Sequence, residues 1–174
     1  MDLSYPIGKF DWAQTVTPDR RIQFIGDIAA APAKFREASA GLNDTQLDTA
    51  YRPDGWTIRQ VIHHVADSHM NSYIRFRLAL TEEQPAVKGY NEAEWAKLHD
   101  SHTLPLDCSL QLLDGLHVRW VDLLQSMTDA DFARSFRHSE KGLIRLEMNL
   151  ALYSWHSRHH AAHITSLRER MGWG

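Results

Sequence analysis

The chain has 174 residues and only one cysteine, Cys108. A single cysteine cannot form an intrachain disulfide, and it excludes a zinc site built from several thiolates. Any metal ion would therefore have to bind histidine and carboxylate side chains. The lack of disulfides is also typical of proteins in the reducing cytoplasm.

Long apolar runs and an excess of positive charge are lacking as well. No stretch approaches the roughly 20 apolar residues that a membrane-spanning helix needs, and the opening MDLSYPIGKFDW lacks the apolar centre of a signal peptide. The formal net charge is −3, from 19 basic and 22 acidic residues, so nothing favours a nucleic-acid partner. We therefore expect a soluble, cytoplasmic protein that binds neither nucleic acid nor a membrane.

Most of the sequence has the spacing of apolar residues that is typical of amphipathic helices. Thr17, followed by a proline, indicates the start of a first long helix, which we expect Pro32 to kink or split. Thr57 and Gln60 form a capping box at the start of a second one. The four long helices are predicted at about residues 17–41, 57–80, 106–127 and 143–171.

The connections contain weaker signals. Asn91 is an N-cap for a short helix between the second and third long helices, and residues 128–142 have room for a short hairpin. The sequence therefore predicts an all-α protein, a four-helix bundle with a short extra helix in the connection between the second and third long helices. Bundles of this kind place metal sites on facing helices.

The 11 histidines are the unusual feature of the composition, and four of them lie in WHSRHHAAHI, residues 155–164. At about 100° per residue, His160 falls within the apolar face of the last helix and His156 at its edge. His159 and His163 fall further out, so we expect them behind the first pair or at the surface. Two histidines four residues apart can bind one metal ion from consecutive turns.

A third ligand has to come from a facing helix, and VIHHVADSHM in the second helix offers three histidines. His64 lies at the head of a polar stripe beside the apolar face. His63 falls further out, whereas His69 falls among apolar residues and is expected to be a hydrogen-bonded core histidine. The stripe is more polar than packing requires, which favours the wall of a cavity over a solvated face. It comprises Gln60, His64, Asp67, Ser68, Asn71 and Arg75.

The residues therefore predict a metal site formed by His64, His156 and His160. Three neutral imidazoles leave a coordination position open, which distinguishes catalytic from structural zinc sites. Asp67, one turn from His64, is a candidate to orient a ligand or to act as a base. The imidazoles alone would suit zinc, nickel, copper or iron(II).

GWTIRQVIHHVADSH and YSWHSRHHAAHI resemble two motifs of the DinB superfamily, and specifically of its YfiT-like branch, the bacillithiol-transferase type. YPIGKF, GLNDTQLDTAYRPDGW and NSYIRFRLALTE resemble the same branch, so the resemblance covers nearly the whole chain. The family pattern has a histidine about eight residues after the tryptophan of the first motif, which selects His64 after Trp56. On the last helix it has two histidines four apart, the second four residues before an aliphatic residue, which selects His156 and His160 before Ile164.

The resemblance implies a single helical-bundle domain over residues 1–174, one divalent metal ion per chain, and a homodimer. Zinc is the first choice for the metal and nickel the second. Such proteins are commonly described as metal-dependent hydrolases, and characterised relatives include S-transferases that join a low-molecular-weight thiol to an electrophile. We therefore expect a metal-dependent thiol S-transferase of the bacillithiol type, with a small thiol and a small electrophile as partners. Asn71 and Arg75, with Tyr153 or Arg158, are candidates to bind polar parts of the substrate.

Two alternatives stay open at this point. The metal could activate water, with Asp67 as the base, and the protein would then be a hydrolase. The metal could also be structural, or the protein a binding module without catalysis, although a structural site would normally contain a fourth protein ligand. Cys108 is not expected to be a nucleophile, since no catalytic pattern surrounds it.

Overall fold

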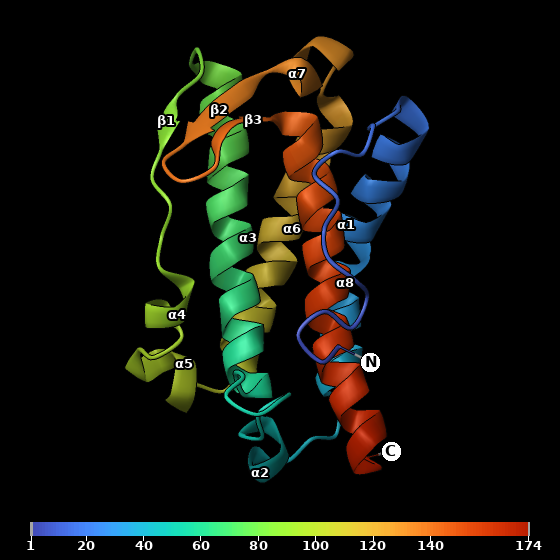
Figure 1. Ribbon diagram of the computed structural model, residues 1–174, viewed down its shortest axis with the longest axis vertical. Coiled ribbons are helices and arrows are strands. Elements are labelled where there is room, and N and C mark those ends of the chain that lie inside the picture. The colour runs from blue at the N-terminus through green and yellow to red at the C-terminus, as the bar shows by residue number, and fades with distance from the viewer. Residues whose placement is uncertain (1, 174) are drawn as a thin grey trace.

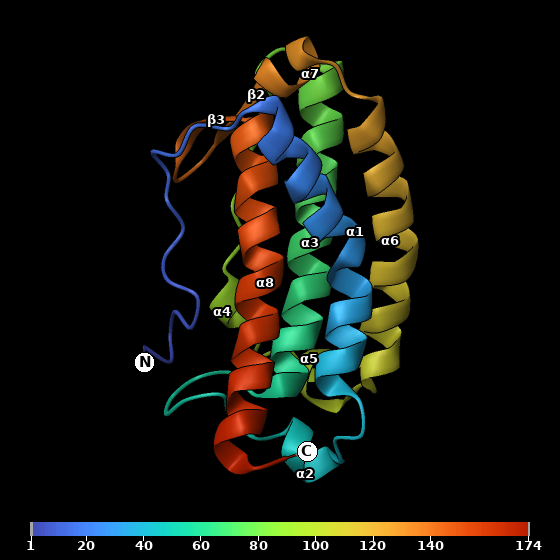
Figure 2. The same cartoon turned by 90° about the vertical axis from the view of Figure 1, so that its right-hand side faces the viewer.

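Four long helices form an upright bundle in the computed structural model, which describes residues 2–173. They are α1 (Pro18–Ser39), α3 (Ile58–Thr81), α6 (Leu106–Ser126) and α8 (Leu146–Met171). In Figures 1 and 2, α3 and α6 run upward and α1 and α8 run downward. Helices α1 and α3 each pack against both α6 and α8, which confirms the predicted four-helix bundle.

The predicted starts of the first two long helices are confirmed by their caps. The Thr17 hydroxyl accepts a hydrogen bond from the Arg20 N–H at the start of α1. Thr57 and Gln60 form the reciprocal capping box of α3. These contacts satisfy N–H groups that have no partner within the helix, so each start is fixed by a few polar atoms.

Pro32 does not split α1, which continues through it. A proline inside a helix has no N–H, so the carbonyl four residues earlier, that of Ile28, lacks its helical partner. His117 of α6 supplies the replacement, with its Nδ1 2.7 Å from the Ile28 carbonyl oxygen. The expected break is therefore prevented by a side chain from a neighbouring helix.

The connections contain more structure than the sequence predicted. One short helix was expected before α6, and there are two, α4 (Glu92–Trp95) and α5 (His99–Thr103). The hairpin is confirmed as β2 (Ser135–His138) and β3 (Gly142–Arg145), and β1 (Ala86–Val87) extends it in parallel to β2. Two further helices are α2 (Asp44–Leu47) and α7 (Asp129–Ala133).

The predicted start of the last helix, near Leu143, is wrong by a few residues. Leu143 belongs to β3, where it pairs with Arg137, and α8 begins at Leu146. Cross-strand pairing favours the extended backbone here, and the adjacent Ile144 is buried against the bundle. The small sheet consequently closes one end of the bundle, beside the top of α3 (Figure 1).

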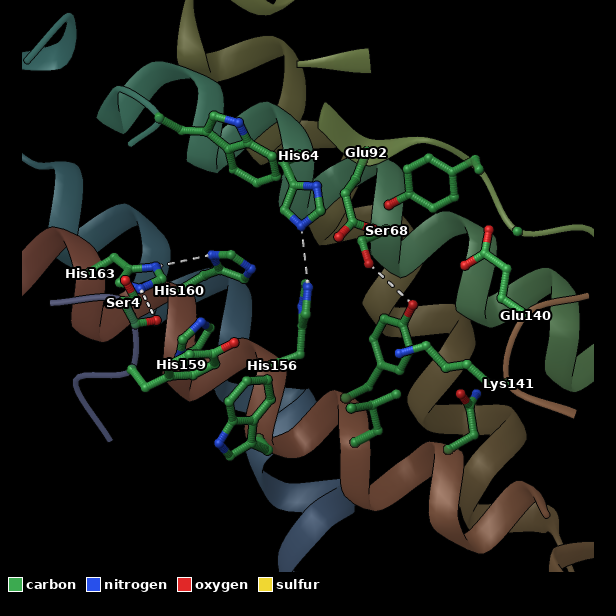
Figure 3. Close-up of a pocket in the computed structure, with 18 of the residues that line it drawn as sticks. Ser4, His64, Ser68, Glu92, Glu140, Lys141, His156, His159, His160 and His163 are labelled. Carbon is green, nitrogen blue, oxygen red and sulfur yellow. Dashed lines mark hydrogen bonds between the residues drawn. The ribbon is translucent and has the colours of Figure 1, made fainter. Parts of the chain in front are cut away.

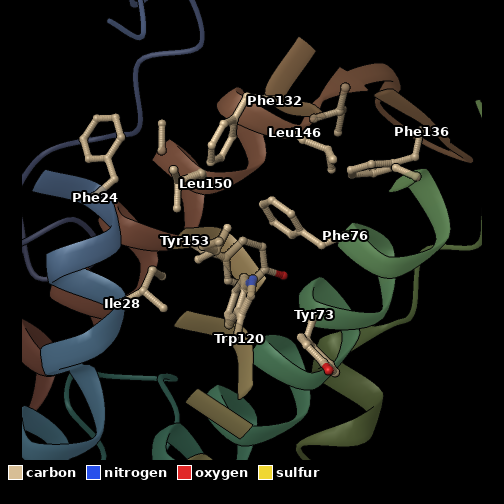
Figure 4. Packing of buried hydrophobic residues seen from close by; sticks show 14 residues of the cluster. Phe24, Ile28, Tyr73, Phe76, Trp120, Phe132, Phe136, Leu146, Leu150 and Tyr153 are labelled. Carbon is tan, nitrogen blue, oxygen red and sulfur yellow. The ribbon is translucent and has the colours of Figure 1, made fainter. Parts of the chain in front are cut away.

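The core consists of two apolar clusters with a polar layer between them. One cluster surrounds Trp120 and Phe76 near the sheet (Figure 4), and the other surrounds Phe35 and Ile62 near α2. Between them the helices contribute buried polar side chains: Ser68, His69, Ser72, His117, Ser154, Ser157 and His160. Within residues 2–173, no helix is long and apolar enough to cross a membrane.

Candidate metal centre

Three histidines converge in this polar layer (Figure 3). His64 comes from α3, and His156 and His160 come from consecutive turns of α8. One nitrogen of each ring lies within 4.8 Å of the other two. Because α3 and α8 pack together and run in opposite directions, residues about 90 positions apart meet here.

The spacing of two of these nitrogens fits a tetrahedral metal ion. The Nε2 atoms of His64 and His156 are 3.3 Å apart. Two nitrogens bound to one zinc ion at about 2.05 Å are separated by about 3.3 Å in tetrahedral geometry. Donors of this type and spacing leave the fourth position to an exogenous ligand, as in catalytic zinc sites.

Burial keeps the three ligands neutral at neutral pH. It lowers the pKa of His64 to about 4, with a further contribution from the charge of His163. It also lowers the pKa values of His156 and His160 well below the ordinary histidine range. A neutral imidazole has the free lone pair that a metal ion requires, so protons compete little for this site.

A cavity of about 420 Å³ opens beside the three histidines. It is lined by both aromatic and polar side chains, among them Trp56, Ser68, Arg75, Glu92 and Tyr153. The Ser68 and Tyr153 hydroxyls are hydrogen-bonded to each other at 3.1 Å (Figure 3). A volume of this size accommodates a small organic molecule in contact with a bound metal.

A family model of the DinB superfamily matches residues 27–164. The chain belongs to this superfamily. A Bacillus mycoides protein named "Putative metal-dependent hydrolase" is 53% identical over 172 residues, which cover 99% of both chains. A Bacillus cereus protein of the same name is 52% identical over the same length and coverage.

Solved structures agree with this assignment. YfiT from Bacillus subtilis, described as "a probable metal-dependent hydrolase with an unusual four-helix bundle topology", superimposes with a TM-score of 0.96 at 50% identity over 100% of both chains. A mycothiol-dependent maleylpyruvate isomerase superimposes with a TM-score of 0.63 at 17% identity, covering 81% of this chain and 59% of that one. The second likeness concerns the fold alone.

Not all polar residues predicted for the site reach the cavity of this DinB protein. Asp67 lies toward α5, where burial and the charge of Asp100 raise its pKa to about 6, and it is not part of the cavity wall. The Asn71 amide donates to the Asp67 carbonyl along its own helix, also outside the wall. Arg75 does line the cavity, as does Tyr153.

The structure also brings in residues that sequence reasoning did not select. Glu92, the first residue of α4, contributes a carboxylate to the wall of the cavity. Arg158, a candidate for binding substrate, instead pairs with Asp27 at 3.2 Å. The N-cap signal of Asn91 placed the short helix correctly, but nothing in the local sequence indicated that this helix faces the cavity.

The remaining histidines near the site are buried. His159 and His163 are only 6% and 3% exposed, because the N-terminal segment covers this side of α8. The Nε2 of His163 lies 3.3 Å from the Ser4 carbonyl oxygen. Both residues are therefore buried rather than at the surface, and they line the cavity beside the predicted ligands. His69 is fully buried with both ring nitrogens hydrogen-bonded, as predicted for a core histidine.

Proposed function

We propose that this DinB protein is a metal-dependent enzyme that transfers a low-molecular-weight thiol to a small electrophile. The observation that carries the proposal is the open three-histidine centre in the wall of a 420 Å³ cavity. No carboxylate within residues 2–173 is hydrogen-bonded to His64, His156 or His160. A thiol needs no such base, because its own acidity is sufficient once a metal ion polarises it.

His64, His156 and His160 would hold one divalent ion, for which zinc is the first choice and nickel the second. When bound, the ion lowers the pKa of a coordinated thiol or water and so supplies a nucleophile at neutral pH. The three histidines bind through neutral nitrogens and leave the positive charge of the ion uncompensated, which strengthens its effect on an anionic sulfur. The remaining wall then has to position the electrophile.

Two tyrosines are suited to that task. Burial raises the pKa of Tyr153 above its ordinary value, so its hydroxyl keeps its proton and can donate to a polar atom of the electrophile. Burial raises the pKa of Tyr90 in the same way, and this residue also lines the cavity. Trp56 contacts His64, with ring centroids 4.6 Å apart, and limits the access of water from that side.

Hydrolysis is the second candidate function, favoured by the names of the relatives and by one observation. Glu92 lines the same cavity and could assist hydrolysis as a base that accepts the proton of the attacking water. The two reactions therefore differ in their dependence on Glu92 and on added thiol.

The deciding experiment uses zinc-loaded protein with a thiol and a chromogenic alkylating electrophile, and separately with chromogenic esters without thiol. We expect turnover only with thiol, and we expect Glu92→Gln to retain most of it. Ester cleavage without thiol that is lost in Glu92→Gln would establish the hydrolase instead. His99→Ala, at an exposed histidine remote from the cavity, is the control for nonspecific effects.

The partners expected from the family resemblance belong to the same proposal. We propose a small thiol and a small electrophile as substrates, a homodimer in solution and a cytoplasmic location. Sedimentation of the purified protein at several concentrations tests the dimer independently of the chemistry.

A further inference from the structure

Arg75 is a buried cation without a partner at the other end of the cavity from the metal centre. It follows His64 on α3 by about three turns, or about 16 Å along the helix axis. It is only 7% exposed and lines the cavity. Within the described part of the chain it makes no ion pair, and its buried Nε has no hydrogen-bond partner.

Other buried arginines of the same chain are paired. Arg59, 6% exposed, contacts Asp48 at 2.7 Å and Asp44 at 2.8 Å. Arg21, 8% exposed, pairs with Asp129. An unpaired buried charge is strongly unfavourable, since it loses hydration without gaining a counter-ion. Arg75 therefore differs from the arginines that serve packing.

We propose that Arg75 binds a carboxylate of the substrate whose sulfur occupies the metal centre. This inference rests on the proposed thiol transfer and names the class of thiol, one with a carboxylate several bonds from its sulfur. A guanidinium binds a carboxylate through two parallel hydrogen bonds, which fixes orientation as well as position.

The other charged groups of the wall are less suited to hold an anion. Arg52 also lines the cavity with a buried, unpartnered Nε, but it is only half-buried, lies near His163, and donates through Nη1 to the Pro53 carbonyl at 2.9 Å. Lys141 lies at the rim, and Glu92 and Glu140 oppose the binding of an anion there. Burial, and then the charge of nearby Arg75, lower the pKa of His138, so this residue adds no positive charge at neutral pH. Arg75 is thus the buried cation available to an anionic ligand.

Calorimetric titration of the zinc-loaded protein with three probes tests the inference. The probes are 6-mercaptohexanoate, 6-mercaptohexanol, which lacks the carboxylate, and hexanoate, which lacks the sulfur. We expect the carboxylate to improve the affinity of the thiol about tenfold or more. Arg75→Gln should abolish that difference, Arg75→Lys should retain part of it, and the matched control Lys141→Gln should retain it.

The outcomes separate this inference from the proposed function. Equal affinity for the two thiols, or a difference that persists in Arg75→Gln, would overturn the role of Arg75. Binding of 6-mercaptohexanoate no tighter than hexanoate would overturn metal–thiol binding while leaving the carboxylate site standing. Failure of all three probes to bind would overturn both.

A different observation supports a second inference: the metal ligand His156 ends a relay of buried imidazoles. Its Nδ1 lies 3.2 Å from His69 Nε2. The Nδ1 of His69 lies 2.8 Å from His117 Nε2. The Nδ1 of His117 lies 2.7 Å from the Ile28 carbonyl oxygen, the one that Pro32 leaves without a helical partner.

The carbonyl at the end of the relay determines every tautomer in it. A carbonyl only accepts, so His117 donates through Nδ1 and, being neutral, accepts through Nε2. His69 must then donate through Nδ1 and accept through Nε2. His156 in turn donates through Nδ1, which leaves the lone pair on its Nε2, the atom that faces His64.

The ligand His160 has a shorter relay of the same kind. The Ser4 carbonyl accepts from His163 Nε2 at 3.3 Å, so the neutral His163 has its lone pair on Nδ1. That atom lies 3.4 Å from His160 Nδ1. His160 therefore donates through Nδ1 and has its lone pair on Nε2, as His156 does.

We infer that His69, His117 and His163 are positioning residues that hold two metal ligands in the binding tautomer. A ligand that is already oriented binds the metal more tightly, because no ring has to rotate or exchange a proton. Removal of such supporting contacts typically weakens metal binding about 10- to 100-fold.

The test compares His117→Leu with His117→Gln by competition of the protein and a chelator for zinc. The leucine fills the space but neither donates nor accepts, so we expect about tenfold weaker zinc binding. The glutamine can both donate to Ile28 and accept from His69, so we expect it to restore much of the affinity. Unchanged affinity in His117→Leu would overturn the relay.

Nitrogen-15 NMR of the histidine rings in the zinc-loaded wild type tests the same inference without any variant. We expect the ring protons of His156 and His160 on Nδ1, and finding them on Nε2 would contradict the relay. Zinc stoichiometry checks the second relay, because His159, His160 and His163 also lie within 4.8 Å of one another. One zinc ion per chain is expected, and two would make His163 a ligand instead of a positioning residue.

Discussion

Single side chains decide whether this bundle binds a metal. His64→Ala and His160→Ala each remove one of the three proposed ligands, so we expect both variants to lose zinc binding while retaining the helical circular dichroism of the wild type. His99→Ala, which alters an exposed histidine, should bind zinc normally. A wild type that binds no divalent ion would refute the site, and an unfolded His64→Ala protein would indicate a structural metal.

Arg75 is expected to lower the stability of the ligand-free protein. Because it is buried without a counter-ion, we expect Arg75→Met to raise the free energy of unfolding of the ligand-free protein by about 1 kcal/mol or more. Arg59→Met should lower it, since Arg59 is ion-paired to Asp44 and Asp48. Urea denaturation of the two variants measures both effects, and equal losses of stability would show that Arg75 has a structural role.

The convergence of His64, His156 and His160 could be predicted from the sequence, but the surroundings of the polar stripe could not. A helical wheel gives the direction of each side chain from its own helix, which was sufficient for His64, His156 and His160. It does not say which element lies opposite. Asp67 and Arg75 share a stripe, yet Asp67 lies toward α5 and Arg75 lines the cavity.

At the scale of elements, the start of α3 controls the position of His64, two turns further on. Thr57→Ala removes the side-chain half of the capping box, so we expect a loss of about 1 kcal/mol in unfolding free energy. Thr57→Ser keeps the hydroxyl and should lose much less. Thermal or urea denaturation distinguishes the two, and equal losses would show that the methyl group, not the cap, matters.

The starts of the first two long helices were predictable because caps are local, and the β2–β3 hairpin was expected, whereas the addition of β1 to it was not. The capping contacts of Thr17 and Thr57 join residues three apart in sequence. Strand β1 instead pairs with β2, about 50 residues later, and so depends on how α3, α6 and α8 bring the two together. The effect of Pro32 was only partly predictable. Its missing N–H is evident from the sequence, whereas the hydrogen bond between His117 and the Ile28 carbonyl that compensates for it is not.

For the whole molecule, histidine burial predicts acid sensitivity. Nine of the 11 histidines have pKa values lowered in the folded state, chiefly by burial. The unfolded chain then binds more protons than the folded one below a pH of about 6.5, so stability falls as the pH drops from there toward about 4. Asp67, with its pKa raised to about 6, opposes this trend as a single group.

Urea denaturation of the metal-free protein at about pH 7, 6 and 5 measures this slope. We expect the unfolding free energy to decrease steadily over the series. Replacing His159 and His163, whose pKa values are lowered to about 3 and about 4, by glutamine should flatten it. A stability that is constant between neutral and mildly acid pH would contradict the neutral, buried state of these rings.

Pro32 in α1 has a consequence for which substitutions this chain can tolerate during evolution. The Ile28 carbonyl that anchors the longer relay belongs to the main chain, so every amino acid at position 28 would supply it. What makes that carbonyl available is Pro32, and what uses it is His117. In a comparison of many descendants, this hydrogen bond would therefore connect positions 32 and 117, whereas position 28 would be constrained only by the packing of its buried side chain.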